Sequence, residues 1–172
     1  MSVQWPGCAW GASSLIRKEN TSDGPYVRKL LTDSFPASQE AGLVARLRTA
    51  YMLAIALVGD EDGELAGYIA FSPFTVASVA GLGLAEDRRR RGLGAQRVRE
   101  GLAACRLAGC GFAVVLGDPA YYGRFGFQPG RRWGLHCAYG GGDALQALEL
   151  RPGTIPASGG AVSDAPALDA LA

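Results

Sequence analysis

The sequence predicts an α+β domain with a mixed sheet, in which a parallel strand pair follows an antiparallel hairpin. The hairpin is indicated by two apolar runs, 52–58 and 65–72, on either side of the turn Asp60-Glu61-Asp62-Gly63. The parallel pair is indicated by strand-like residues 79–84, a helical pattern and a second strand-like run over 112–116. Such a unit requires a right-handed crossover between parallel strands. With 172 residues, 48% of them hydrophobic, the chain can form one domain with a sizeable core.

A short strand and two helices are expected before the hairpin. The strand starts at Ser14, and residues 1–13 are expected to form an N-terminal arm outside the fold. The first helix covers residues 26–35 and follows the capping stretch Ser22-Asp23-Gly24-Pro25. The second helix follows Ser38 and is predicted to bury three apolar side chains at helical spacing: Leu43, Val44 and Leu47.

The crossover unit follows the hairpin. Pro73 is expected to interrupt the second hairpin strand, which residues 74–76 then continue. The crossover helix is predicted to begin near Leu93 and to end near Gly109. Its buried face consists of apolar residues at helical spacing: Ala95, Val98, Leu102 and Cys105.

The last part of the chain contains a second helix-start signal. Asp118 is expected to cap a short helix with Pro119 at its first position, and Gly126 is expected to end it. A late strand is predicted over residues 147–150. Residues 152–172 are rich in Gly, Ala and Pro, which predicts a C-terminal tail or edge segment.

Composition and charge disfavour several classes of protein. The net charge is +1, whereas a dedicated nucleic-acid binder has a basic excess over a whole face. The four cysteines include no CxxC pair and His136 is the only histidine, so we expect no metal site and reduced cysteines. The first residues lack a signal-peptide pattern, and the apolar run 52–58 is too short to span a bilayer. We therefore expect a soluble cytoplasmic protein.

The stretch RRRRGLGA, residues 88–95, joins the predicted strand 79–84 to the crossover helix. The first turn of a helix has amide hydrogens without internal partners, and the helix dipole adds positive potential there. Gly92 and Gly94 lack the Cβ atoms that would keep a phosphate from these amides. This pattern alone favours a phosphate cradle and a solvated arginine run about equally.

Two motifs resemble the GNAT acetyltransferase superfamily. Arg89, Gly92 and Gly94 fit its acetyl-CoA loop, Q/R-x-x-G-x-G/A, and Tyr122 begins a Y-x-x-x-G-F motif within GDPAYYGRFGF. The segments AFSPFTV, LGDPAYYGRFGF and ALEL are similar to a bacterial branch of N-acetyltransferases. The resemblance covers roughly residues 14–150 and departs from the family's pattern at two positions. Glu86 stands where a proline is usual, and an aspartate replaces the asparagine often found before the tyrosine helix.

The resemblance implies a fold and a cofactor site. The fold is α/β/α layered, with a mixed, mostly antiparallel sheet whose splayed parallel strand pair holds acetyl-CoA, and the domain covers residues 14–151. Backbone groups of Leu82, Gly83 and Leu84 would face the pantetheine arm, and Asp118 would lie near it. The pyrophosphate would be held by loop residues Arg89, Arg90, Arg91, Gly92, Leu93, Gly94 and Ala95.

The resemblance also implies the chemistry: transfer of an acetyl group from acetyl-CoA to a primary amine of a small molecule or protein by direct attack. Tyr122 occupies the family's general-acid position and is preferred over Tyr121 for protonating the leaving thiolate. The two side chains would point about 100° apart on a helix, so only one easily faces the cofactor sulfur. The general base and the amine acceptor are not identified.

Two other classes of function remain open at this point. One is a non-catalytic acyl-CoA-binding sensor module, which would bind the cofactor without turnover. The other is RNA or DNA binding through Arg88–Arg91, which the near-neutral charge disfavours, so we expect no nucleic-acid or membrane partner. The oligomeric state is also open, with a homodimer as one arrangement.

Overall fold

The structure is a computed structural model that describes residues 14–34, 39–61, 64–76, 79–86, 91–137 and 141–164. Its strands are β1 (Ser14–Lys18), β2 (Ile55–Glu61), β3 (Glu64–Val76), β4 (Val79–Glu86), β5 (Phe112–Leu116), β6 (Gln128–Pro129), β7 (Leu135–Cys137), β8 (Leu145–Glu149) and β9 (Gly160–Asp164). Its α-helices are α1 (Gly24–Ser34), α2 (Gln39–Thr49), α3 (Arg91–Leu107) and α4 (Pro119–Tyr122). Its 3-10 helices are η1 (Thr21–Asp23), η2 (Gly123–Phe125), η3 (Gly130–Trp133) and η4 (Gly142–Ala144).

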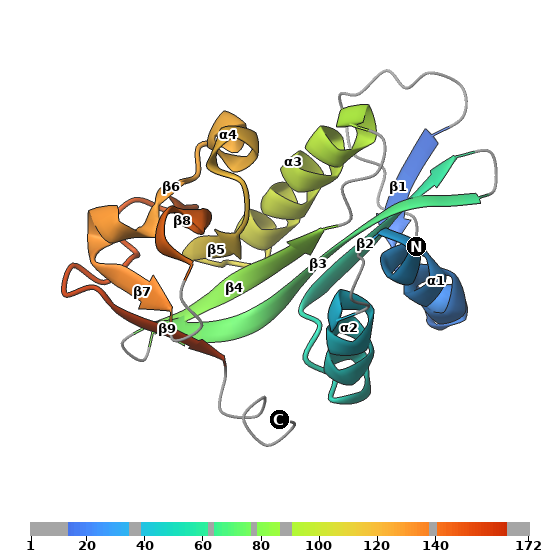
Figure 1. Cartoon of the computed structure of the whole chain (residues 1–172), viewed down its shortest axis with the longest axis horizontal. Coiled ribbons are helices and arrows are strands. Elements are labelled where there is room, and N and C mark those ends of the chain that lie inside the picture. The colour runs from blue at the N-terminus through green and yellow to red at the C-terminus, as the bar shows by residue number, and fades with distance from the viewer. Residues whose placement is uncertain are drawn as a thin grey trace.

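The described elements form an α/β/α arrangement around one mixed sheet (Figure 1). The main strand order is β1-β2-β3-β4-β5-β8-β6, and β9 pairs with both β3 and β7. Figure 1 shows α1 and α2 on one side of the sheet and α3 and α4 on the other. The predicted fold class is therefore confirmed. Along the described part of the chain, no helix combines the length and apolar character needed to cross a bilayer.

The predicted hairpin is β2–β3, and its alternating side chains separate the two helical layers. Tyr68 and Ala70 pack against α1 and α2, in a cluster that includes Val27, Leu31, Ala41 and Val44. Ile69 and Phe71 pack on the opposite face, in a cluster that includes Val98, Leu102, Cys105, Ala113, Val115 and Tyr122. Because successive side chains of a strand point to opposite faces, β3 contributes residues to the core on each side of the sheet.

Three details of this region differ from prediction. Residues 52–54 precede β2 rather than belong to it, because the amide of Met52 donates to the carbonyl of Leu47 and closes the end of α2. Pro73 does not interrupt β3, since it lies where the pairing with β2 has ended at Phe71 and that with β9 is about to begin. Leu43 is 41% exposed, and Ala41 takes its place in the core.

The predicted parallel pair is β4–β5, connected through α3. The strand extends to Glu86 and the helix starts at Arg91, so the connecting segment between the two elements is 87–90, which lies outside the described residues. The predicted buried face of α3 is confirmed at Val98, Leu102 and Cys105, whereas Ala95 is half-buried.

The last two strands, β8 and β9, join the sheet through pairings with earlier strands. β8 covers 145–149 rather than 147–150 and pairs antiparallel with β5. Residues 160–164, within the predicted tail or edge segment, form β9, which pairs antiparallel with β3 and parallel with β7. Ile155, just before this strand, is buried with Phe112 and Leu145. This part of the segment therefore belongs to the sheet.

Candidate active site

The two parallel strands pair over only a short stretch. Their ladder consists of Leu82↔Ala113 and Gly83↔Val114, although β4 continues to Glu86 and β5 to Leu116. Beyond the ladder, β4 stays paired with β3 on its other side, and β5 stays paired with β8. The facing edges of β4 and β5 therefore separate after Gly83, which leaves backbone polar groups available to an extended ligand.

The predicted pantetheine residues fall on both sides of this point. Leu82 and Gly83 are inside the ladder, whereas Leu84, paired with Phe71 of β3, is the first residue beyond it. Of the three, Leu84 is therefore best placed to offer its backbone to a ligand between the strands.

The first turn of α3 follows β4 and contains the described part of the predicted phosphate cradle. Arg91, Gly92, Leu93, Gly94 and Ala95 are all helical, and Gly94 is buried. Their amides include the unbonded donors of a helix start, where the helix dipole also favours an anion. Arg89 and Arg90 lie outside the described residues.

A buried arginine fixes this helix start to the hairpin. The Arg97 side chain is fully buried, and its Nη1 donates to the carbonyl of Ala66 at 3.3 Å. Its guanidinium lies against the cross-strand pair Gly59↔Gly67, and a Cβ on Gly67 would overlap it. Sequence reasoning missed Arg97, and the two glycines in facing strands were the only local signal of it.

The short helix α4 presents its two tyrosines to different surroundings. Asp118 caps the helix by accepting from the amide of Ala120 at 2.9 Å. Tyr122 is 3% exposed and packs edge-to-face on Phe127, with 5.7 Å between ring centroids. Tyr121 is half-buried, and the Arg124 guanidinium lies over its ring at 4.7 Å. The two rings differ in burial but contact each other edge-to-face, with 4.9 Å between their centroids, and Tyr121 packs against the same core cluster as Tyr122.

Tyr122 and the separated strands share one face of the sheet. Its ring belongs to the cluster that contains Phe71 and Val115. Phe71 pairs with Leu84, and Val115 directly follows the last paired residue of β5. The structure thus brings Tyr122 to the same side of the sheet as α3, beside the part of β5 that borders the gap.

Cys105, which is buried, and Cys110, which is half-buried, are poor nucleophiles. Desolvation raises the pKa of Cys105 to about 12, and burial also raises the pKa of Cys110. Both thiols therefore stay protonated near neutral pH. These two thiols are therefore poor candidates for an acyl-cysteine nucleophile.

Acidic side chains near the N-terminal helices are engaged in ion pairs. Glu19 pairs with Arg48 and accepts a hydrogen bond from the Tyr68 hydroxyl, and Asp23 pairs with Arg17. Glu64 is exposed at the start of β3. Within the described ranges, no three His, Cys, Asp or Glu side chains are grouped as metal ligands would be.

The comparisons with known proteins agree with this geometry. The family model "Acetyltransferase (GNAT) family" matches residues 25–127, and the chain therefore belongs to the GNAT acetyltransferase family. YhbS of Escherichia coli (strain K12), an uncharacterized N-acetyltransferase, is 40% identical over 135 residues, which cover 74% of this chain and 81% of YhbS.

Two solved structures are similar over most of their length. The crystal structure of YhbS from Escherichia coli in complex with CoA has a TM-score of 0.84 at 34% identity, and the match covers 95% of this chain and 96% of that one. A GNAT family acetyltransferase from Brucella melitensis in complex with acetyl-CoA has a TM-score of 0.74 at 34% identity, with 91% and 98% covered.

Proposed function

We propose that this protein binds acetyl-CoA between β4 and β5 and transfers the acetyl group to a primary amine of a small molecule or protein. The observation that carries the proposal is the early end of the β4–β5 ladder at Gly83, on the strand that precedes α3 in the chain. An extended cofactor arm can pair with the open strand edge while its diphosphate meets the helix amides. The similar structures in complex with CoA or acetyl-CoA support the choice of cofactor.

The binding residues have distinct roles in this proposal. The amides from Arg91 to Ala95 hold the diphosphate, and the side chains of Arg89 and Arg90 add positive charge. The backbone of Leu84 pairs with the pantetheine arm, and its amide polarises the thioester carbonyl. Asp118 acts mainly by starting α4, because its carboxylate already accepts from the helix amide of Ala120.

The chemistry requires a neutral amine and a protonated leaving thiol. A lysine-like amine has a pKa of about 10.4, so it must lose a proton, to a base or to water acting through one, before it attacks the thioester carbon. Tyr122 then donates its hydroxyl proton to the sulfur as the carbon–sulfur bond breaks. The transfer is uphill by about 2 kcal/mol, since a phenol has a pKa of about 10 and a thiol of about 8.5. Positioning beside the sulfur offsets a penalty of this size.

An acceptor screen tests the proposal. The purified protein is mixed with acetyl-CoA and a panel of small primary amines and peptide amines, and release of free CoA thiol is recorded. At least one amine should give thiol release well above the rate of spontaneous hydrolysis, with the acetylated amine detected by mass spectrometry. Tight acetyl-CoA binding with no turnover on any amine would instead assign the protein to the sensor class.

A further inference from the structure

Gln146, on β8, has a fully buried polar side chain that takes no part in the proposed chemistry. The other buried polar or charged side chains among the described residues have clear partners or neighbours: Asp23 pairs with Arg17, and Arg97 lies against the hairpin glycines. An amide that is buried without a hydrogen bond destabilises a fold. The partner of Gln146 therefore indicates why a polar residue occupies this position.

The side chain of Gln146 lies on the face of the sheet that carries Tyr122. Gln146 pairs directly with Val115 of β5, and the side chains of paired residues stand on the same face. Val115 belongs to the cluster that contains Tyr122, and Leu148, two residues after Gln146, packs against the same cluster. From there the Nε2 of Gln146 donates to the carbonyl of Gly117 at 3.1 Å, in the segment that connects β5 to α4.

This hydrogen bond takes the place of a missing backbone bond. Continued by one residue, the register of β5 and β8 places Gly117 opposite Ala144, and the Gly117 amide does donate to the Ala144 carbonyl at 2.9 Å. A regular antiparallel pair would return a bond from the Ala144 amide to the Gly117 carbonyl. That amide instead donates to the carbonyl of Gly141 at 2.7 Å, in the turn that forms η4. Gln146 thus supplies the donor that the ladder lacks at Gly117.

Gly117 is followed directly by the cap of the helix that carries Tyr122. Asp118 caps α4, and its carbonyl accepts from the amides of Tyr121 and Tyr122, each at 3.0 Å. With four residues, α4 is too short to be stable through its own hydrogen bonds, so its position depends on the segment before it. Both backbone polar groups of Gly117 are bonded to residues of the segment 144–146, which therefore fixes the start of α4.

We propose that Gln146 is a positioning residue for the proton donor Tyr122. Its amide holds the start of α4, and the helix in turn holds the Tyr122 hydroxyl where it can protonate the leaving sulfur. A displacement of about 1 Å at a catalytic group can lower the rate about 100-fold. Gln146 acts through Tyr122 and not on the reacting atoms. This inference rests on the proposed function and adds to it a buried residue outside both sequence motifs.

The test is a double-mutant cycle on kcat, with an amine from the acceptor screen. The natural protein, Gln146→Met, Tyr122→Phe and the double variant are compared, and calorimetry gives their dissociation constants for acetyl-CoA. Gln146→Met should lower kcat about tenfold or more in the natural protein but less than about twofold in Tyr122→Phe, because a misplaced phenol matters only while its hydroxyl is present. Acetyl-CoA affinity should stay within about twofold, since the residues proposed to bind the cofactor lie mainly on β4 and α3.

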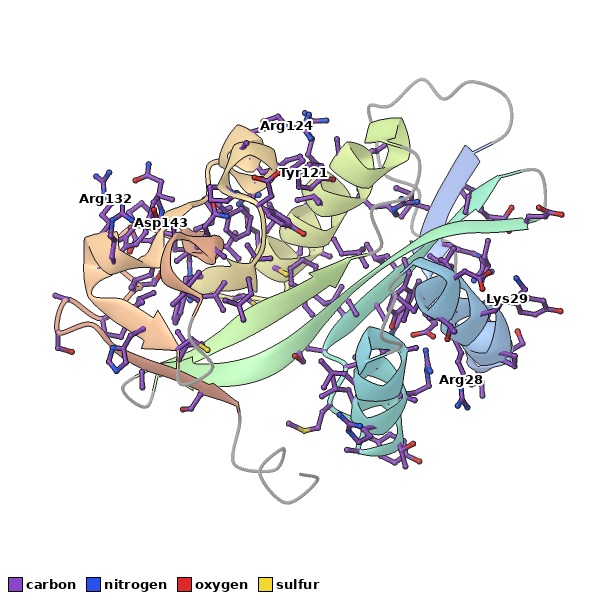
Figure 2. All side chains as sticks on the ribbon, in the orientation of Figure 1. Arg28, Lys29, Tyr121, Arg124, Arg132 and Asp143 are labelled. Atoms are coloured by element: carbon purple, nitrogen blue, oxygen red, sulfur yellow. The ribbon has the colours of Figure 1, made fainter. Side chains whose placement is uncertain are left out.

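Gln128→Met is the matched control. Gln128 is an exposed residue of the neighbouring strand β6, and its side chain accepts from Arg132, which Figure 2 shows at the edge of the molecule, apart from Tyr121. This variant should keep kcat within about twofold of the natural value. Hydrogen exchange adds a readout that needs no turnover: the amides of α4 should exchange faster in Gln146→Met, whereas those of α3 should not. Where Gln146→Met does not fold, Gln146→Leu takes its place.

An equal loss of kcat in the natural protein and in Tyr122→Phe would overturn the inference, because Gln146 would then not act through the hydroxyl. Natural kcat or unchanged exchange of the α4 amides in Gln146→Met would overturn it as well. These results leave the proposed acetyl transfer intact. Full activity of Tyr122→Phe would remove both the acid role and this inference but keep the transfer. If the natural protein acetylates no amine, the proposed function fails and the inference fails with it.

Discussion

The guanidinium of Arg97, in α3, lies so close to Gly67, in β3, that a Cβ atom at position 67 would overlap it. Because Arg97 is fully buried, its side chain cannot swing into water to make room. This contact joins the helix that begins the proposed phosphate cradle to the centre of the hairpin. The position of the cradle amides therefore depends on a glycine 24 residues before the first residue of α3.

Replacing Gly67 with alanine should destabilise the protein. The new Cβ would displace the buried guanidinium, and overpacking of this kind costs about 1–3 kcal/mol. The free energy of unfolding is measured by urea denaturation. Gly24→Ala is the control, since nothing lies within 4 Å of its added Cβ and alanine favours a helix. In a protein that already carries Arg97→Ala, Gly67→Ala should lower the free energy of unfolding by less than it does in the natural protein. An equal loss in both backgrounds would mean that the two residues do not interact.

Replacing Tyr122 with phenylalanine should lower kcat by about 100-fold or more and leave acetyl-CoA affinity within about twofold. The substitution removes only the hydroxyl proposed to protonate the thiolate and keeps the contact with Phe127. Tyr121→Phe is the matched control, because that ring packs with Arg124 and should retain nearly full activity. Steady-state kinetics with an amine from the acceptor screen measure both. Full activity of Tyr122→Phe would move the acid role to another group.

Replacing Gly94 with valine should weaken acetyl-CoA binding at least about tenfold. A branched side chain in the first turn of α3 would keep the diphosphate from the helix amides, and one lost charge-assisted hydrogen bond is worth about 1.5–3 kcal/mol. Calorimetry gives the dissociation constant, and the melting temperature tests for a folding defect. Gly123→Val is the comparison, since Gly123 is exposed with open space around its Cβ position. If Gly94→Val and Gly123→Val bind acetyl-CoA equally tightly, the first turn of α3 does not hold the diphosphate.

Replacing Tyr51 with glycine should stabilise the protein by about 0.5–1 kcal/mol. Tyr51 lies two residues after the end of α2, has a positive φ of 56° and is 95% exposed. The position therefore carries backbone strain without compensating packing, and glycine is the usual residue there. Chemical denaturation measures the gain. Tyr26→Gly is the comparison, because Tyr26 is exposed within α1 and glycine weakens a helix. A loss of stability at Tyr51 would show that the tyrosine makes a compensating contact.

The sequence predicted those elements that neighbouring residues determine. The Asp118-Pro119 pair is enough to start α4, and Val98, Leu102 and Cys105 are enough to orient α3, because caps and helical periodicity act within a few residues. Tyr122 was proposed as the general acid in the same way, through a local motif, and the structure adds that its ring packs against the sheet.

The missed features depend on contacts between distant segments. Pro73 continues in β3 because β9, almost ninety residues later, takes over from β2 at that point. Arg97 reads as a surface residue of a helix until the glycines beneath it are known to face each other across two strands. Such features follow from topology, which local periodicity does not encode.

Asp23 should make the stability of the N-terminal helices depend on pH. Hydrogen bonds from Arg17 lower the pKa of its carboxyl below the ordinary value, the amide of Asn20 adds to the effect, and burial opposes it. A carboxyl whose pKa is lower in the folded state stabilises the fold above its unfolded pKa of about 3.9, and this stabilisation is lost as the pH falls through the folded value. The unfolding free energy should therefore fall more between pH 6 and about pH 3 in the natural protein than in Asp23→Asn, which has no such proton to gain. Asp33→Asn is the control, because Asp33 forms an exposed pair with Lys29, and exposed pairs contribute little. Parallel pH profiles for the natural protein and Asp23→Asn would mean that the Arg17 pair contributes no more in the folded chain than an exposed one.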